Sequence, residues 1–171
     1  RSPSQIWGNH GTACSGIISA KTNNNLGVAG IAPNCPVMSI SNQLMGTSDA
    51  PQKRADGFNW AWRNGASVIS NSWRSSTFSE LLEDAIQSAM TNGRNGLGCV
   101  VTFSAGNYDS NTVGYPARSL PDIIVVGALS LSGKRKSSTT IDNEGWWGSD
   151  YGTQLDIMAP GVLIYTTDRT G

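Results

Sequence analysis

The stretch Cys99-Val100-Val101-Thr102-Phe103, which runs on into Ser104-Ala105-Gly106-Asn107, decides the fold. It begins with a short, continuous apolar run, and a second such run extends from Ile123 to Ala128. Apolar runs of this length, about four to eight residues, are typical of strands that are buried on both faces of a sheet. We therefore expect buried strands at residues 99–103 and 123–128.

Capping and breaking residues predict two helices upstream of these strands. Asn9 can cap a helix that runs from His10 to about Ala20. Asp49 and Pro51 mark the start of a second helix, because proline suits the first turn, and Gly65 ends it.

A third helix and two further strands complete the pattern. Thr77 and Glu80 have the spacing of a capping box, and the apolar stripe that follows is stopped by Gly93. The stripe consists of Leu81, Leu82, Ala85, Ile86, Ala89 and Met90. Residues 37–40 and 68–72 are interpreted as short strands.

The alternation of strands with helices predicts the fold class α/β, with a mostly parallel sheet. Right-handed crossovers place helices on both faces of such a sheet. Ligands bind beyond the carboxyl ends of its strands, where the loops after Ser72 and Ala105 are expected.

Composition excludes several classes of protein. Of the 171 residues, 38% are apolar and 14% are charged, which excludes a disordered chain. The net charge is zero, so no general attraction to nucleic acid or to an anionic membrane is expected. The basic run Lys134-Arg135-Lys136 is interpreted as a solvated turn, and no apolar stretch approaches the ~20 residues of a membrane span.

Three cysteines, Cys14, Cys35 and Cys99, are too few and too scattered for a disulfide framework or a metal knuckle. They are interpreted as small buried residues. A single bridge, Cys14–Cys35 or Cys35–Cys99, stays open, because sequence does not give the separation of the thiols.

Two patches carry candidate chemistry. His10, the only histidine, lies near a helix start with Gly11 beside it. Asn107 directly follows an apolar strand, and a side-chain amide at that place suits a hydrogen-bond donor to an oxyanion. Taken singly, a structural histidine and an ordinary turn asparagine are the commoner cases.

Read together and in order, six segments resemble the subtilisin-like serine peptidases, or subtilases. The histidine motif of the family is similar to residues 10–16, and its oxyanion motif is similar to Ser104-Ala105-Gly106-Asn107. The other four similar segments are Val28–Pro33, Val68–Ser72, Val113–Ala117 and Leu155–Gly161.

The resemblance implies a doubly wound parallel sheet and peptide-bond hydrolysis through an acyl-enzyme, with an Asp/His/Ser triad. It implies that His10 is the general base and that Asn107 donates to the oxyanion. The implied substrate-binding residues are Ser72, Trp73, Arg74, Ser104, Ala105, Gly106 and Gly114. Gly114 takes the base of the primary pocket, which predicts a deep pocket for large apolar residues. Arg74 departs from the small residues usual in the family, and its charge would favour acidic groups there.

In the family the triad aspartate precedes the histidine, and the serine follows the segment matched by Pro160-Gly161. Neither motif is found in residues 1–171, which are therefore interpreted as the central part of a peptidase domain. We expect this segment to be inactive alone and to pair with the flanking parts of its domain. The segment Gly46–Pro51 looks like the serine motif, but Ser48 precedes the oxyanion motif and is rejected as the nucleophile.

Calcium is the implied structural cofactor. Residues 22–28, which include the candidate ligand Asn24, resemble the calcium loop of the family, although a plain polar turn is the alternative. Asp156 resembles a second cation ligand. Cys14, four residues after His10, is interpreted as packing beneath the imidazole and not as a nucleophile.

The leading hypothesis is a secreted or cell-surface serine endopeptidase that acts on peptide or protein substrates. The alternative is a non-catalytic subtilase-like domain that serves for binding.

Overall fold

The computed structural model describes residues 8–42 and 46–169. The chain divides into two compact units, Arg1–Gln43 with Ile164–Gly171 and Leu44–Leu163. The first unit contains the helix α1 (His10–Ser19). The second contains α2 (Ala50–Arg63), β1 (Val68–Asn71), α3 (Glu80–Gly96), β2 (Val100–Ser104), β3 (Ile124–Leu129) and β4 (Ile157–Pro160).

The four strands form one sheet in the order β1-β2-β3-β4, and every neighbouring pair is parallel. The register pairs Asn71 with Phe103, so β1 and β2 end at the same edge of the sheet. The expected α/β class and the strands near 68–72, 99–103 and 123–128 are confirmed. The strand β4 was not predicted: it has only four residues and ends in Pro160, and proline within a short apolar run counts against a strand.

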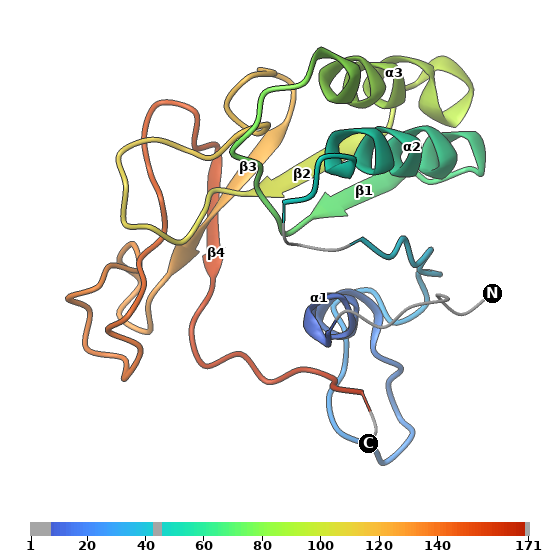
Figure 1. Ribbon diagram of the computed structural model, residues 1–171. Coiled ribbons are helices and arrows are strands. Elements are labelled where there is room, and N and C mark those ends of the chain that lie inside the picture. Colours follow the sequence, from blue (N-terminus) through green and yellow to red (C-terminus); the bar gives the residue numbers. More distant parts are fainter. Residues whose placement is uncertain (1–7, 43–45, 170–171) are drawn as a thin grey trace. The chain divides into compact units, whose positions relative to one another are not determined.

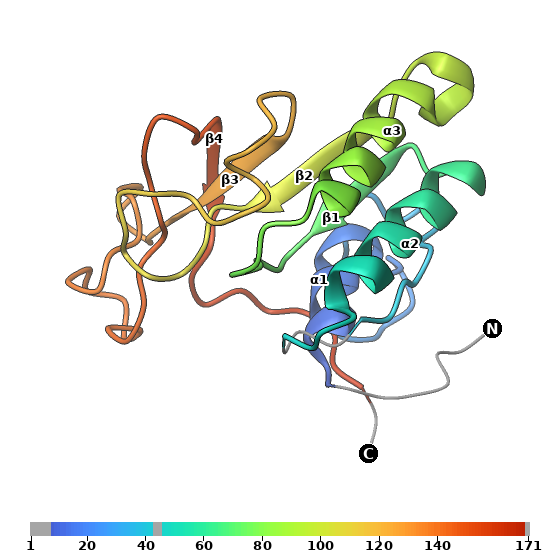
Figure 2. The ribbon, with the colours of Figure 1, turned by 45° about the horizontal axis from the view of Figure 1, so that its top comes forward.

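The helices α2 and α3 pack side by side over one face of this sheet (Figures 1 and 2). Their core is built by Phe58, Leu82 and Ile86 against Phe103 and Val125. Burial on β2 alternates: Val101 and Phe103 are 1% exposed, while Val100 on the opposite face is 38% exposed. The expectation of burial on both faces is therefore wrong for β2, because both helices of this unit cover the same face.

The start of α3 differs in detail from the sequence-based expectation. Ser79, and not Thr77, is the N-cap, and its hydroxyl accepts a hydrogen bond of 3.3 Å from the Leu82 N–H. The stop at Gly93 is confirmed, because the backbone leaves helical geometry there (φ −59°, ψ 159°).

Among the helices of the described ranges, none combines the length and the apolar character that a membrane span requires.

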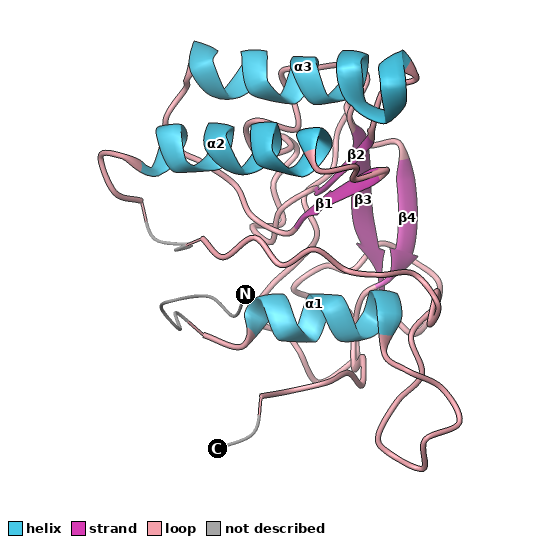
Figure 3. Ribbon diagram, turned by 90° about the vertical axis from the view of Figure 1, so that its right-hand side faces the viewer, coloured by secondary structure: helices cyan, strands magenta, loops and turns pink. Residues whose placement is uncertain are grey.

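In the first unit, the expected helix at residues 10–20 is confirmed as α1 (Figure 3). The Asn9 side chain does not cap it but donates to the Asp168 carboxylate at 2.9 Å. Segment 164–169 runs along α1, where the Thr166 hydroxyl donates to the Ala13 carbonyl at 2.6 Å. Gly16 permits this approach, because a Cβ there would overlap the Thr167 hydroxyl.

The expected strand at residues 37–40 is wrong. These residues are irregular, and Val37, Met38 and Ile40 are 43–46% exposed. An apolar sequence of strand length forms a strand only where a partner supplies the ladder hydrogen bonds. In the described structure residues 37–40 have no such partner.

Neither of the two possible bridges, Cys14–Cys35 or Cys35–Cys99, is formed. Cys99 is buried as expected, and its thiol donates to the Ala66 carbonyl at 3.0 Å. Burial raises the pKa of this thiol. Cys35 is exposed, which corrects its interpretation as a buried residue.

Candidate active site

The loops that follow β1 and β2 meet at the carboxyl edge of the sheet. The Ser75 N–H donates to the Tyr115 carbonyl at 2.8 Å, and these residues form an isolated antiparallel bridge. The Gly114 N–H donates to the Ala105 carbonyl at 3.1 Å. The connections that follow β1 and β2 thus bring the segments 72–75, 104–106 and 113–115 together at the edge of the sheet where ligands bind in folds of this class.

Arg74 lies against Gly114. A Cβ built on Gly114 would be 3.2 Å from the Arg74 Cβ, so the absence of a side chain there leaves room for the arginine stem. The guanidinium then reaches the ring of Tyr108, 4.0 Å from its centroid. The space beside Gly114, expected to hold a large apolar substrate group, is thus bordered by a cation.

Trp73 lies mainly on the core side of its loop. Its ring packs edge-on against Phe103 with centroids 5.0 Å apart, and the Arg54 guanidinium stands 4.4 Å above it. The indole N–H donates to the Asn71 amide oxygen at 3.1 Å. Burial lowers the pKa of Arg54, whose side chain is held in this packed layer. The Trp73 side chain therefore anchors the loop to the core.

Asn107 is exposed and comes three residues after the last residue of β2. Within the described residues its side-chain amide makes no hydrogen bond, so its donors are available to a ligand. The backbone around it is held firmly, because the Ala105 N–H donates to the Val126 carbonyl at 2.9 Å and the Asp150 N–H donates to the Gly106 carbonyl at 2.9 Å. A free amide on a fixed backbone is what oxyanion stabilisation needs.

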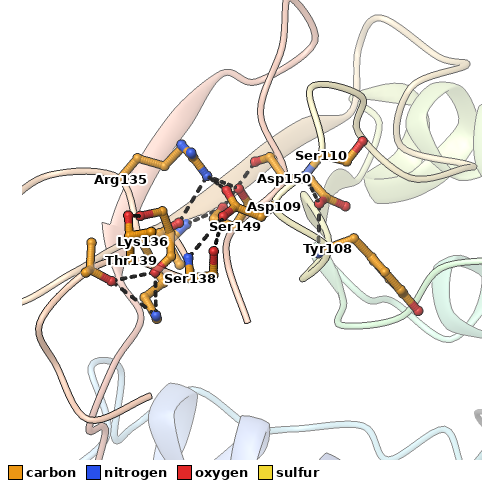
Figure 4. A network of polar contacts seen from close by, with 12 residues as sticks. Tyr108, Asp109, Ser110, Arg135, Lys136, Ser138, Thr139, Ser149 and Asp150 are labelled. Atoms are coloured by element: carbon orange, nitrogen blue, oxygen red, sulfur yellow. Dashed lines mark hydrogen bonds and ion pairs between the residues drawn. The ribbon is translucent and has the colours of Figure 1, made fainter. Parts of the chain in front are cut away.

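Two carboxylates that the sequence did not single out hold this loop (Figure 4). Asp150 is fully buried, and one of its oxygens accepts from the N–H groups of Tyr108 at 2.8 Å and Ser110 at 3.0 Å. Asp109 accepts from Arg135 at 2.6 Å and from the N–H and hydroxyl of Ser138 at 3.0 and 2.9 Å. No local pattern marks Asp150, because its partners lie about 40 residues earlier in the chain.

The interpretation of residues 134–136 as a solvated turn is wrong for Lys136, which is 0% exposed. Its ammonium donates to the carbonyls of Ser137 and Glu144 and to the Thr140 hydroxyl, at 2.8 to 3.1 Å. The buried Asp142 carboxylate lies 3.3 Å away and supplies the counter-charge. A lysine is buried only when its charge and all its donors are matched, and those partners come from the fold of the loop itself.

His10 is the first residue of α1 and is exposed. The Cys14 sulfur lies 3.8 Å from its Nε2, one helical turn on, which agrees with the expected packing of the thiol beneath the ring. His10 belongs to the first unit, and Asn107 belongs to the second.

The two residues expected to bind calcium are placed in different surroundings. Residues 21–29 line an open hollow, and Asn23, Asn25 and Gly27 have positive φ. The Asn24 side-chain oxygen accepts from the Leu26 N–H at 3.1 Å. The Asp156 carboxylate accepts from the Val125 N–H at 2.7 Å.

Within residues 8–42 and 46–169 there is no group of three His, Cys, Asp or Glu side chains that could hold a metal. A cation at the loop around Asn24 would therefore take amide and carbonyl oxygens, and one at Asp156 would add a single carboxylate to backbone oxygens.

Comparison with known proteins now adds family information. The family model described as the subtilase family matches residues 1–170. A calcium-dependent protease of Trichormus variabilis is 33% identical over 180 residues, which cover 95% of this chain and 26% of the relative. Subtilisin NAT of Bacillus subtilis subsp. natto is 34% identical over 96% of this chain and 40% of the relative, and subtilisin Savinase of Lederbergia lenta is 34% identical over 96% and 55%.

The chain thus spans between about a quarter and about half of the length of these relatives. Its own match is almost complete, because the family model extends over residues 1–170 and includes both His10 and Asn107. The chain belongs to the subtilase family.

Proposed function

We propose that the chain is part of a serine endopeptidase domain that hydrolyses peptide bonds in peptide or protein substrates through an acyl-enzyme. The observation that carries this proposal is the family match over residues 1–170, which contains the single histidine and the asparagine that follows β2. The exposed amide of Asn107 on a fixed loop supports it, because such a donor can act on charge that develops in the transition state.

In this proposal His10 takes the proton of the nucleophilic serine and later gives it to the leaving amine. Asn107 donates a hydrogen bond to the tetrahedral oxyanion. The serine and the triad aspartate are supplied by sequence that flanks residues 1–171. Ser48 has no catalytic part in this proposal, and its place in the turn before α2, where Asp49 and Pro51 start the helix, supports a structural role.

The substrate backbone is proposed to bind between the loop after β1 and the loop after β2. The proposed lining residues are Ser72, Trp73, Arg74, Ser104, Ala105, Gly106 and Gly114, of which Trp73 would contribute its backbone, because its side chain packs toward the core. Their support is the Ser75–Tyr115 bridge, which joins the two loops, and the Gly114–Ala105 hydrogen bond, which folds the loop after β2 back on itself. The proposal includes a secreted or cell-surface location, and calcium at the loop around Asn24 and at Asp156.

The test uses the full-length protein that carries this chain and a fluorogenic peptide substrate. We expect His10→Ala to lower kcat by as much as about 10⁶-fold, the cost of removing this base in subtilisin. Asn107→Ala is expected to lower kcat by about 10²–10³-fold with little change in KM, because its bond forms mainly in the transition state.

Asn92→Ala serves as the matched control, because Asn92 is an exposed residue of α3 and lies outside the site. Its turnover should equal that of the unmodified enzyme. Near-normal turnover of the His10 variant, or absence of any peptidase activity in the full-length protein, would favour the non-catalytic binding domain instead.

A further inference from the structure

The loop that carries Asn107 is tied to a buried carboxylate that the catalytic proposal does not use. Asp150 is 0% exposed, and its Oδ1 accepts both the Tyr108 N–H and the Ser110 N–H. Its own N–H donates to the Gly106 carbonyl at 2.9 Å. Asp150 therefore makes three hydrogen bonds to the five-residue segment 106–110, on both sides of Asn107.

The Arg74 guanidinium, from the loop after β1, supplies the positive charge that faces this carboxylate. The Asp150 Oδ2 has no hydrogen-bond partner in the described structure, and the Arg74 Nη1 lies 3.9 Å from it. The Arg74 guanidinium also stacks on the ring of Tyr108, one of the two residues whose N–H the carboxylate accepts. A buried carboxylate needs such a counter-charge, because burial of an unpaired charge is strongly unfavourable.

Gly106 leaves the space that this carboxylate occupies. Its φ is +120°, a conformation that residues with side chains rarely adopt, and a Cβ there would overlap Asp150 Oδ2. The backbone conformation at Gly106 and the position of the Asp150 carboxylate therefore depend on one another. The hydrogen bonds of Asp150 hold the peptide groups on both sides of Asn107, through the Gly106 carbonyl and the Tyr108 N–H, and so they set the direction in which the Cα–Cβ bond of Asn107 leaves the backbone.

We propose that Asp150, with Arg74 as its counter-charge, is a positioning residue that holds the Asn107 loop in the geometry needed for oxyanion binding. This inference rests on the proposed role of Asn107. It assigns to Arg74, beyond any contact with substrate, the task of pairing with the buried carboxylate and holding it in place.

A kinetic cycle in the full-length enzyme tests the coupling. Asp150→Ala is expected to lower kcat about 10- to 100-fold, as misplacement of a catalytic group by about 1 Å does, with KM nearly unchanged. In an Asn107→Ala background, the same change should cost less than about threefold more, because residues that act as a unit are not additive. Asp150→Asn keeps an oxygen for both N–H groups and should restore kcat to within about threefold. Fully multiplicative losses, or an effect confined to KM, would overturn the proposal.

Hydrogen exchange of the Tyr108 and Ser110 amides tests the clamp without any activity. Asp150→Ala should speed the exchange of these two amides at least about tenfold, while Asp150→Asn and the control Asp84→Asn, an exposed residue of α3, leave them protected. If Asn107→Ala leaves kcat unchanged, the proposed role of Asn107 fails, but this readout still decides whether the clamp exists.

If Asp150→Ala does not fold, Arg74→Ala replaces it. The uncompensated carboxylate should then loosen the same two amides, and Asp150→Asn in the same chain should protect them again. Unchanged exchange in Arg74→Ala, or loosening that Asp150→Asn does not reverse, means that Arg74 does not act through Asp150 and rejects the inference.

Discussion

At the scale of single residues, Asp109 shows how hydrogen bonds and an ion pair from residues distant in the sequence stabilise the charged form of a loop carboxylate. It adopts a positive φ of 55°, and its carboxylate accepts from Ser138 and Arg135. The backbone hydrogen bond from Ser138, then the Arg135 guanidinium and the Ser138 hydroxyl, lower the pKa of Asp109 from 3.8 to about 2. Each of these contacts favours the charged form.

This shift predicts a pH dependence of folding stability. Because the folded pKa lies below the unfolded value, the stabilisation is complete above pH 3.8 and is lost as the pH falls through about 2. Asp109→Asn should therefore lower the melting temperature at pH 7 and have a progressively smaller effect as the pH falls toward 2. The measurement is thermal unfolding by circular dichroism across this range.

Asp84→Asn is the control for that series, because Asp84 is exposed on α3 and has no ion pair among the described residues. It should leave the melting temperature almost unchanged. An Asp109→Asn effect of equal size at pH 7 and pH 2 would show that the lost stability comes from shape and not from charge.

At the scale of elements, α3 shows a difference between the N-cap residue that the sequence pattern predicts and the one that the tertiary structure uses. The apolar stripe is confirmed, with Leu82, Ile86 and Ala89 buried against the sheet, while Leu81 at its margin is 46% exposed. The N-cap is displaced by two residues from Thr77 to Ser79. The Tyr115 hydroxyl donates to the Ser79 carbonyl and accepts from the Ser79 N–H, both at 3.0 Å, and this tertiary contact fixes the chain at Ser79.

We expect Ser79→Ala to destabilise the protein by about 1 kcal/mol, because the Leu82 N–H loses its side-chain acceptor. Thr77→Ala is the matched variant, since the capping-box spacing names Thr77 and the structure gives its side chain no such role. Urea unfolding of both variants measures the difference. Equal losses would show that the hydroxyl of Ser79 does not cap the helix.

At the scale of the whole molecule, the calcium proposal can be tested by removal of the ion. A ligand present at about 100 times its dissociation constant stabilises the native state by about 2.7 kcal/mol. At about 2–4 °C per kcal/mol, a chelator should lower the melting temperature of the full-length protein by roughly 5–10 °C. The measurement is a melting curve in calcium and in excess chelator.

Asn24→Ala and Asp156→Asn assign the effect to the two places. Each variant should reduce the response to chelator if its side chain binds the ion, and Asn92→Ala should leave the response unchanged. A melting temperature that does not respond to chelator would remove the support for both sites.

The sequence by itself determined the α/β class, the helices α1, α2 and α3, and three of the four strands. Proline and glycine at helix ends and continuous apolar runs act over a few residues, so they can be read locally. It also singled out His10 and Asn107, but only through the resemblance of six ordered segments to the subtilases, because each local pattern alone is more often structural; the family match contains both residues.

Only the tertiary structure decided which face of β2 is buried, that β4 joins the sheet, and that residues 37–40 remain irregular. It also decided that Lys136 is buried with Asp142 and that Asp150 clamps the Asn107 loop. The burial of a charge depends on counter-charges and hydrogen bonds that the completed fold assembles, here from segments as far apart as residues 74, 108 and 150. Composition and spacing describe neighbours along the chain, whereas the electrostatic free energy of these groups is set by neighbours in space.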